Sequence, residues 1–292
     1  MPATKLRIHR PTSKTRKLTR PRTRASPSPR TIQKGKAINV LTYNISWESM
    51  TGRKPNWELC SNNTDPNHPR HNSVCVSNVA RVFEDNPADF VLLQEADSHE
   101  HLIQQSPRLA GMRFEFHESS RDKMITFWDK KYKHVHIVRG EFEPGRPWMA
   151  ILYSNGWCVV NVHFGHYSRK DEIAQLNQLI QKIKKEFSHQ ANQPNHTNQP
   201  NLSKMTRLII GGDFNYDIKL LGQSGMLTLD TSIEFHYHPR NLLTCCINRR
   251  VQNDHVIDTG GPLLDIKIPR VAHMASDHKP ILATLACSSL AP

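Results

Sequence analysis

The chain has 292 residues, a length that suits one large domain or two small ones. Six cysteines in a chain of this length do not indicate a disulfide scaffold, and no apolar stretch reaches the roughly 18 residues of a transmembrane helix. No apolar segment follows the basic start as a secretory signal would require. We therefore expect a soluble, intracellular protein with reduced cysteines, and a monomer.

Positive charge is concentrated in a basic tail, residues 1–37, which contains 12 Lys or Arg and no Asp or Glu. The whole chain has 39 basic and 26 acidic residues, so the remainder is close to neutral, with 27 basic against 26 acidic residues. The net charge of +13 therefore belongs to the tail and does not by itself make the folded part a nucleic-acid binder.

The basic tail is also rich in Ser, Thr and Pro and almost free of aliphatic residues. It cannot bury enough apolar surface to offset its chain entropy, so we expect it to be disordered. Three interpretations compete: an arm that binds nucleic acid or directs the protein to the nucleus, an organelle transit peptide, or a solvated linker. The many prolines oppose the amphipathic helix of a transit peptide, and the basic arm, with nucleic acid as its partner, is preferred.

A single folded domain is predicted over residues 38–287. It begins with an apolar run over 37–45, which is typical of a buried strand. Apolar residues at helical spacing predict a helix over 74–85, which the pair Asn86-Pro87 ends. A second buried strand is predicted over 89–97.

A polar insertion is predicted at about residues 49–73, between the first strand and the first helix. In and beside it, Cys60, His68, His71 and Cys75 have the chemistry of zinc ligands. Their spacing, with seven, two and three intervening residues, matches no common zinc module. A plain surface insertion is therefore favoured over a zinc site.

The middle of the chain alternates apolar runs with turns that contain charged residues or glycine, including the hairpin pair Asn155-Gly156. Successive strands are predicted over 113–119, 123–129, 133–140, 147–153 and 157–164. Residues 170–187 form the clearest helix, because its apolar residues share one face, acids lead it and lysines trail it. A second polar insertion, of low complexity, follows at about 188–206.

The segment LIIGGDFNYD, residues 208–217, combines a short buried strand with a glycine pair. Gly211 and Gly212 are expected to turn the chain tightly at the end of the strand. Asp213 and Asn215, at positions i and i+2, would then point the same way and could hold a metal, a water or a phosphate. Beyond this segment, residues 218–230 are a helix or a loop, 253–260 a short strand, and 275–287 polar residues followed by a strand.

Polar residues lie at one end of several apolar runs: Asn44, Glu95, His163, Asp213, Asn215, Asp254, Asp277 and His278. Each alone is more often structural, and His163 could be a satisfied core histidine. Together they supply the oxygen ligands that Mg²⁺ prefers, donors for the charge on a phosphate, and a base for an attacking water. The set predicts hydrolysis of phosphoesters.

These residues lie in motifs that resemble, in order, those of the endonuclease/exonuclease/phosphatase superfamily, which has the DNase I-like fold. The motifs are TYN at 42–44, LQE at 93–95, NVHF at 161–164, GGDFN at 211–215, DHVI at 254–257 and SDH at 276–278. The resemblance covers about 38–287. It implies an α+β fold, a four-layer α/β sandwich of two packed, mainly antiparallel β-sheets flanked by helices, with the site at one edge.

The resemblance also implies a metal site and a base. Glu95 would be the principal Mg²⁺ ligand, helped by Asn44 and Asp277, with Mn²⁺ as a substitute. Asp213 would orient or deprotonate the attacking water. Asn215 would hold a phosphate oxygen.

The same resemblance implies donors to the phosphate. His278, positioned by Asp254, would donate to the phosphate in the transition state. His163 would be a second acid or phosphate contact, with Asp122 as its acidic partner. Arg146 is a further candidate for phosphate contact, although an ordinary surface arginine is the usual interpretation of such a residue.

The resemblance indicates the reaction better than the substrate. The segments GDFNYD and NDHVID depart from the pattern of inositol-phosphate 5-phosphatases, and His163 fits the DNase-like branches better than the apurinic-site endonucleases. We expect a Mg²⁺-dependent phosphodiesterase, a nuclease that cleaves DNA or RNA by in-line attack of water. A phosphatase or a lipid or tyrosyl-DNA phosphodiesterase of the same fold is the alternative, followed by a catalytically silent scaffold that binds nucleic acid. Cys245 and Cys246 are expected to be small buried residues and not nucleophiles.

Overall fold

The computed structural model describes the domain over residues 37–52, 60, 72–97, 99–166, 168–191, 205–222, 225–229, 233–246, 251–270 and 275–287. The basic tail therefore lies outside the described residues except for its last position. Most of the insertion at 49–73 and residues 192–204 of the second insertion also lie outside them.

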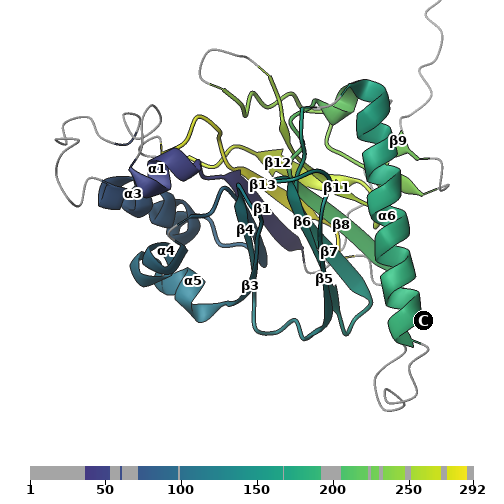
Figure 1. Ribbon diagram of the computed structural model, residues 1–292, viewed down its shortest axis with the longest axis horizontal. Helices are drawn as coiled ribbons and strands as arrows, with labels where there is room; N and C mark the ends of the chain where they lie inside the picture. The colour runs from purple at the N-terminus through teal and green to yellow at the C-terminus, as the bar shows by residue number, and fades with distance from the viewer. Residues whose placement is uncertain are drawn as a thin grey trace, which may run out of the picture. The chain divides into compact units, whose positions relative to one another are not determined.

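Two β-sheets form the centre of the domain (Figure 1). The six-stranded sheet has the order β12 (Leu263–Lys267), β13 (Ile281–Leu285), β1 (Ile38–Asn44), β2 (Phe90–Gln94), β4 (Lys123–Trp128), β3 (Arg113–Glu118). The seven-stranded sheet has the order β5 (His134–Glu141), β6 (Pro147–Tyr153), β7 (Trp157–His163), β8 (Arg207–Asp213), β11 (Asp254–Asp258), β10 (Glu234–His236), β9 (Met226–Thr228). Strands β1 and β2 are parallel, as are β7 and β8, and the other neighbours are antiparallel.

Helices cover the outer face of each sheet, as Figure 1 shows. Helices α1 (Trp47–Thr51), α3 (Asn72–Asp85), α4 (His99–Gln105) and α5 (Pro107–Gly111) lie beside the six-stranded sheet. The long helix α6 (Arg169–Ala191) packs on the seven-stranded sheet, where Leu176 and Ile180 are fully buried. A short 3₁₀ helix, η2 (Ile218–Leu220), follows β8. None of the described helices is both long and apolar enough to cross a membrane.

Three apolar clusters account for the four layers. One lies between the helices and the six-stranded sheet, one between α6 and the seven-stranded sheet, and one between the two sheets. Central strands such as β6 are buried along their whole length because both of their faces are covered, whereas the edge strand β3 is mostly exposed. The predicted four-layer sandwich of two packed sheets is confirmed.

A buried polar contact fixes the two sheets against each other. Asn161 on β7 donates through Nδ2 to the carbonyl oxygens of Leu93 (3.1 Å) and Ile125 (3.0 Å), which belong to the other sheet. Its Oδ1 accepts a hydrogen bond from Nε2 of Gln94 at 2.7 Å. Because buried polar groups are costly when unpaired, these bonds select one relative position of the sheets.

Most elements lie where the sequence placed them, but the glycine pair does not form a turn. Gly211 and Gly212 are the last residues of β8 before Asp213, inside the strand. A Cβ on Gly212 would lie 1.9 Å from the carbonyl oxygen of Val162 on the parallel strand β7. The glycine therefore permits close approach of two backbones, which a strand interior can also require.

Cysteine is used differently from the expectation. The structure joins Cys60 to Cys75 and Cys245 to Cys246, and leaves Cys158 and Cys287 as thiols. The first disulfide engages both sulfurs of the zinc set considered above, and His68 and His71 lie outside the described residues. Cys245 is buried as expected, whereas Cys246 is half-buried.

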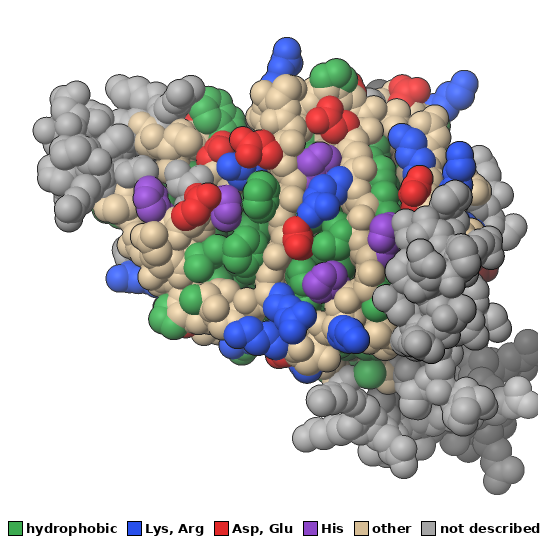
Figure 2. Space-filling view, turned by 60° about the horizontal axis from the view of Figure 1, so that its bottom comes forward, with side chains coloured by type: hydrophobic (Ala, Val, Ile, Leu, Met, Phe, Trp, Pro, Cys, Tyr) green, Lys and Arg blue, Asp and Glu red, His purple; other side chains and the backbone are tan. Residues whose placement is uncertain are grey.

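Surface charge on the domain is mixed. On the face shown in Figure 2, acidic, basic and histidine side chains stand beside hydrophobic ones, with several basic side chains near the lower margin. This pattern agrees with the near-neutral balance of the sequence outside the basic tail. The face carries no single field of one sign that would by itself capture a long polyanion.

Candidate active site

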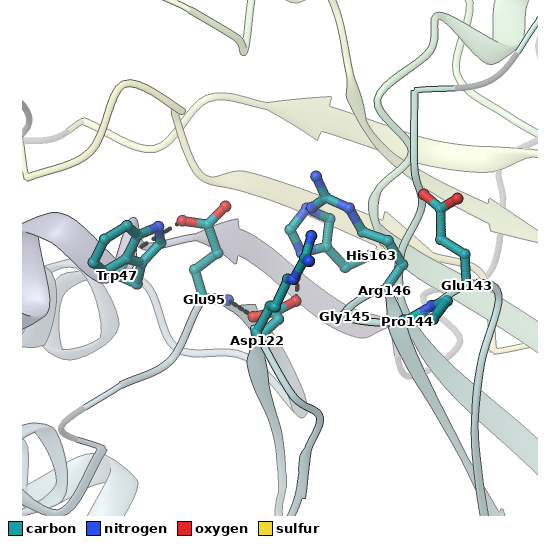
Figure 3. Close-up of a pocket in the computed structure, with 9 residues that line it drawn as sticks. Trp47, Glu95, Asp122, Glu143, Pro144, Gly145, Arg146 and His163 are labelled. Carbon is teal, nitrogen blue, oxygen red and sulfur yellow. Dashed lines mark hydrogen bonds and ion pairs between the residues drawn. The ribbon is translucent and has the colours of Figure 1, made fainter.

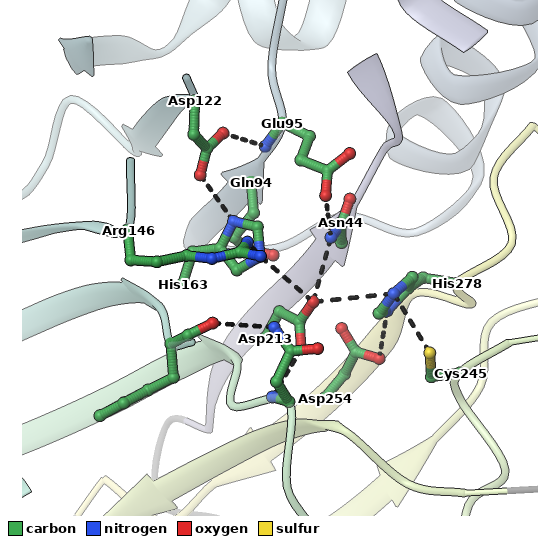
Figure 4. Close-up of polar contacts among 12 residues, drawn as sticks. Asn44, Gln94, Glu95, Asp122, Arg146, His163, Asp213, Cys245, Asp254 and His278 are labelled. Carbon is green, nitrogen blue, oxygen red and sulfur yellow. Dashed lines mark hydrogen bonds and ion pairs between the residues drawn. The ribbon is translucent and has the colours of Figure 1, made fainter. Parts of the chain in front are cut away.

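Asp213 lies between two imidazoles, and each imidazole is backed by a second carboxylate (Figure 4). Its Oδ2 is 3.6 Å from Nε2 of His163 and 3.6 Å from Nε2 of His278. Nδ1 of His163 is 2.6 Å from Oδ2 of Asp122, and Nδ1 of His278 is 2.9 Å from Oδ2 of Asp254. We call these two carboxylate–imidazole pairs the His163 arm and the His278 arm.

The sheet topology brings these residues together. Strands β7 and β8 are parallel and in register at their ends, so that His163 pairs with Asp213. Strand β11 runs antiparallel to β8 and begins opposite its end, which places Asp254 beside Asp213. Residues that are far apart in the sequence thus meet at one edge of the sandwich because their strands end there.

The end of the other sheet supplies Asn44 and Glu95. Nδ2 of Asn44 donates to Oε1 of Glu95 at 3.0 Å and to Oδ2 of Asp213 at 3.1 Å, so this amide connects the two acids. Glu95 also accepts a bond from the backbone N–H of Trp47 at 3.1 Å, and its own N–H donates to Oδ1 of Asp122 at 3.1 Å. With φ 55°, Glu95 adopts a left-handed conformation that residues other than glycine rarely adopt outside constrained sites.

The environment sets the charge of each group. Burial disfavours the carboxylate of Asp213, but the imidazoles of His278 and His163 and the hydrogen bonds from Asn215 and Asn44 outweigh burial and lower its pKa. Burial also disfavours the imidazolium of His278, yet the carboxylates of Asp254 and Asp213 hold the pKa of His278 well above its usual value.

The same balance applies to the remaining members. Burial opposes the charged form of His163, and the carboxylates of Asp122, Asp213 and Glu95 nevertheless raise its pKa. Burial, with a smaller contribution from Asp122, raises the pKa of Glu95 against the lowering influence of His163 and Asn44. Burial likewise raises the pKa of Asp254, which His278 opposes. A cluster of carboxylates whose mutual repulsion is offset by nearby positive charge is well suited to bind a cation or to transfer protons.

A cavity of about 530 Å³ opens beside the His163 arm (Figure 3). It is lined by Trp47, Glu95, Arg121, Asp122, Glu143, Pro144, Gly145, Arg146 and His163. Nη1 of Arg146 lies 2.6 Å from Nε2 of His163. A guanidinium can only donate, so this contact fits a neutral His163 with its proton on Nδ1, facing Asp122.

The donor set suits a divalent metal. The carboxylate of Glu95 and the amide of Asn44 are hard oxygen ligands, which Mg²⁺ and Mn²⁺ prefer. Among the described His, Cys, Asp and Glu side chains, two groups of three bring ligand atoms within 4.8 Å of one another. These groups are Asp213, Asp254 and His278, and Cys245, Cys246 and His278.

The side chains of two predicted residues lie outside the contacts around Asp213. The amide of Asn215 donates to the carbonyl oxygen of Phe164 at 2.8 Å, and its backbone N–H donates to Oδ1 of Asp213 at 2.8 Å. Asp277 lies in the loop before β13, with Oδ1 3.5 Å from the hydroxyl of Ser276. The contact of Asn215 with phosphate and the ligation of a metal by Asp277 stay predictions.

Sequence reasoning missed several residues that hold the site. The hydroxyl of Ser276 donates to the carbonyl oxygen of Asn44 at 2.8 Å and accepts from the N–H of His278 at 3.0 Å. The hydroxyl of Thr244 accepts from the N–H of Asp254 at 3.1 Å. Ser276 belongs to a motif already noted, SDH, but no sequence signal marks Thr244.

Comparison with known proteins identifies the fold. No family model matches the sequence, and no curated protein matches it. The structure is similar to truncated TDP2 from Caenorhabditis elegans, with TM-score 0.55, 15% identity, and coverage of 85% of this chain and 97% of that chain. It is similar to the human Nocturnin catalytic domain with bound sulfate, with TM-score 0.55, 13% identity, and coverage of 85% and 92%.

Two further structures widen the group. One is ANGEL2, described as a 2′,3′-cyclic phosphatase, with TM-score 0.55, 14% identity, and coverage of 85% of this chain and 94% of that chain. The other is an endonuclease/exonuclease/phosphatase family protein from Bacteroides thetaiotaomicron, with TM-score 0.56, 12% identity, and coverage of 86% and 98%. The chain has the DNase I-like fold of the endonuclease/exonuclease/phosphatase superfamily, as its motifs predicted.

Proposed function

We propose that the protein is a metal-dependent phosphoric ester hydrolase, a Mg²⁺-dependent phosphodiesterase that cleaves nucleic acid. The observation that carries the proposal is the position of Asp213, with Oδ2 3.6 Å from an imidazole nitrogen on each side. A buried carboxylate between two potential proton donors can activate a water while the donors meet the charge of a phosphate.

Asp213 would act as the base. Its lowered pKa keeps it ionised, and its hydrogen bonds with Asn44 and the N–H of Asn215 fix the direction of its oxygens. A water held by Asp213 would attack phosphorus in line with the leaving oxygen. Asn215 is suited to contact a phosphate oxygen only if its amide keeps one N–H free of Phe164.

The two arms would stabilise the charge that develops on the phosphate. His278 carries a proton readily, because Asp254 and Asp213 raise its pKa, and Nε2 is the nitrogen that faces Asp213. In the His163 arm, Nε2 accepts from Arg146. A phosphate that draws the guanidinium toward itself would leave Nε2 free to take up a proton, which the surrounding carboxylates favour.

Glu95, with Asn44, is the proposed holder of the metal, and Asp277 is a further candidate. The bound Mg²⁺ or Mn²⁺ would neutralise charge on the phosphate and on the departing oxygen. For Asn44 to offer its oxygen, its amide would have to turn over, because Oδ1 now accepts from the N–H of Ser46 at 3.1 Å and Nδ2 faces Glu95.

The cavity beside the His163 arm favours a nucleotide as the substrate unit. Its lining combines the aromatic side chain of Trp47 with the guanidinium groups of Arg121 and Arg146. Stacking on an aromatic ring and contacts to phosphate are the usual ways in which proteins hold single nucleotides of a strand. The basic tail, with 12 Lys or Arg, would add attraction for a polyanion that weakens with salt.

The second candidate is a phosphatase that acts on the phosphate of a nucleotide end. ANGEL2, one of the similar structures, is described as a 2′,3′-cyclic phosphatase, and the cavity would admit one nucleotide as readily as part of a strand. The two candidates share their chemistry and differ in whether the scissile bond joins two nucleotides.

A substrate panel tests the proposal. The full chain is incubated with single- and double-stranded DNA and RNA, a cyclic nucleotide phosphate, a nucleotide monophosphate and an inositol phosphate, each with Mg²⁺, Mn²⁺ or EDTA. We expect cleavage of nucleic acid with Mg²⁺ and none with EDTA. Release of phosphate from the small substrates without strand cleavage would establish the second candidate, and no turnover of any phosphoester would overturn the function.

A further inference from the structure

Two cysteines adjacent in the sequence lie near His278, and one of them contacts it. Sγ of Cys245 is 3.3 Å from Nε2 of His278, and both side chains are buried. Cys246 is half-buried and is joined to Cys245 by a disulfide. The proposed hydrolysis uses neither sulfur, although one of them contacts the nitrogen that would face the phosphate (Figure 4).

Backbone contacts hold the cysteine segment firmly in this position. The N–H of Cys245 donates to the carbonyl oxygen of Val251 at 3.1 Å. The N–H of Lys279 donates to the carbonyl oxygen of Thr244 at 2.8 Å. Isolated bridges pair Cys245 with both Val251 and His278. The backbone of Cys245 is therefore held beside His278 by interactions that do not depend on the disulfide.

The imidazole of His278 is oriented as in many metal-ligating histidines. Nδ1 faces the carboxylate of Asp254 at 2.9 Å, and Nε2 is the nitrogen that lies 3.3 Å from Sγ of Cys245. A carboxylate behind the second ring nitrogen is the usual support of a histidine that binds zinc. Ligand bonds of about 2.0–2.3 Å around tetrahedral zinc place neighbouring ligand atoms about 3.5 Å apart, close to the present 3.3 Å.

We propose that Cys245, Cys246 and His278 form a three-ligand site for a thiophilic divalent cation, such as Zn²⁺, when the disulfide is reduced. The ligand atoms of the three residues lie within 4.8 Å of one another. Two thiolates and an imidazole are a donor set that zinc and cadmium prefer and that Mg²⁺ does not.

Formation of the site requires a reductant. A dithiol gives two electrons and two protons to the Cys245–Cys246 bond, which becomes two thiols while the reductant becomes a disulfide. The cation then binds the two sulfurs, and both thiol protons leave to solvent. The proton on Nε2 of His278 leaves to solvent as well, because the cation takes the lone pair of that nitrogen. No other bond of the protein changes.

Occupancy of this site would inhibit the hydrolase, a consequence that rests on the proposed function. The cation would occupy Nε2 of His278, the nitrogen that lies 3.6 Å from Oδ2 of Asp213 and would otherwise donate to the phosphate. The Cys245–Cys246 pair would then set whether thiophilic metals can reach the active site.

A cadmium titration tests the site without reference to activity. The full chain is reduced with a trialkylphosphine, which takes up oxygen from water as the disulfide becomes two thiols, and is separated from the phosphine without air. Cd²⁺ is added, and the ultraviolet charge-transfer band of cadmium thiolate is recorded. The wild type is compared with Cys246→Ser, Cys245→Ser/Cys246→Ser and His278→Asn, with Cys287→Ser as the matched control for a cysteine elsewhere. Because reduction also opens Cys60–Cys75 in every variant, the difference between variants reports the proposed site.

We expect the reduced wild type and Cys287→Ser to bind one Cd²⁺ more than the double variant. His278→Asn should weaken the binding of this additional Cd²⁺ at least tenfold. Cys246→Ser should also weaken this binding, while leaving Cys245 in place. Circular dichroism establishes that each variant is folded. Equal Cd²⁺ binding by the wild type and Cys246→Ser, or undiminished affinity in His278→Asn, would overturn the proposal.

A second measurement connects the site to activity. One equivalent of Zn²⁺ should inhibit nucleic-acid cleavage by the reduced wild type and leave the untreated, disulfide-bonded protein active. Cleavage that is unaffected by Zn²⁺ despite the cadmium band would overturn the inhibitory consequence. Absence of all hydrolysis would overturn the proposed function, and the titration would still decide on the metal site.

Discussion

The two arms that meet at Asp213 use the same carboxylate–imidazole pair in different surroundings. The His163 arm contacts a guanidinium, Arg146, and opens on the cavity of about 530 Å³ with charged and polar residues in its lining. The His278 arm contacts a sulfur, Cys245, and borders a smaller cavity of about 290 Å³ that includes Tyr43 and Pro280. Both imidazoles lie 3.6 Å from Asp213.

We propose that this difference separates binding of the phosphate from donation of a proton to it. The His163 arm has a permanent positive charge beside it and is suited to receive an anion. The described contacts of the His278 imidazole include no guanidinium or ammonium group, although Lys279 lines the cavity beside it, and two carboxylates favour its protonated form. We therefore assign the arms to different tasks at one phosphate: the first positions it and the second gives it a proton.

The largest effect is expected at the residue that the arms share. Asp213→Asn should lower kcat about 10³-fold with little change in KM, because it removes the base and retains the shape. The matched control is Asp217→Asn in the same segment, where Asp217 accepts from the N–H of Lys219 at the start of η2. A fall of similar size in both variants would show that the segment, and not the base, was damaged.

A buried acid outside both arms should matter for stability and not for catalysis. Burial, with a contribution from Asp213, raises the pKa of Glu172 to about 8, and both of its carboxylate oxygens lack a hydrogen-bond partner among the described residues. The folded state therefore holds this proton more tightly than the unfolded chain. The contribution of Glu172 to the free energy of unfolding is therefore complete below about pH 4.5, and it is lost as the pH rises toward 8.

Glu172→Gln should remove this loss of stability at high pH. We expect it to raise the free energy of unfolding by several kcal/mol at pH 9, since each pKa unit corresponds to about 1.4 kcal/mol, and to change it little at pH 4.5, measured by denaturant unfolding. Glu186→Gln, on the exposed face of the same helix, serves as the control. An equal response of Glu172→Gln at both pH values would contradict the raised pKa.

The next largest effect is expected at the contact that joins the two sheets from which the arms extend. Asp122 precedes β4 of one sheet and His163 ends β7 of the other, and Asn161 joins those sheets through Leu93, Ile125 and Gln94. Asn161→Ala should lower the free energy of unfolding by about 2 kcal/mol, because it leaves buried partners unpaired. Asn155→Ala, in the exposed turn after β6, should cost less than about 1 kcal/mol. Equal losses would show that the sheets do not depend on this contact.

The smallest effect is expected at Arg146, and it tests whether the His163 arm positions the phosphate. Arg146→Ala should raise KM about tenfold and change kcat little, because one charge-assisted contact to the phosphate is lost. Arg139→Ala, which removes an exposed pair with Glu115 at 2.6 Å, should leave both constants unchanged. A loss confined to kcat in Arg146→Ala would place the arginine in the chemical step and contradict the division of tasks.

The sequence was sufficient to locate the central strands and the polar residues that the structure brings together at their ends. Central strands are continuous apolar runs, and polar residues at their ends stand out against them, so Glu95, Asp213 and His278 could be found by inspection. The pairing of Asp122 with His163 was also predicted, and the structure places their nearest atoms 2.6 Å apart. Short elements with weak patterns, such as β9 and β10, were not predicted.

Contacts between distant segments explain what sequence inspection missed. Asn161 and Gln94 are 67 residues apart, and Cys245 and His278 are 33 apart, so neither pair leaves a local pattern. Gly212 was interpreted as a turn because glycine has several uses, and only the nearby carbonyl of Val162 distinguishes them. Contacts of this kind depend on the packing of whole sheets, which no single window of sequence contains.

The central claim is that both arms serve one phosphate through Asp213, and a double-mutant cycle tests it most directly. The kcat/KM for Mg²⁺-dependent cleavage of one oligonucleotide is measured for the wild type, His163→Asn, His278→Asn and the double variant. We predict that each single variant loses about 10²-fold or more, and that the double variant loses at most about tenfold beyond the more damaging single change. Losses that simply multiply would show two independent groups and would contradict the account.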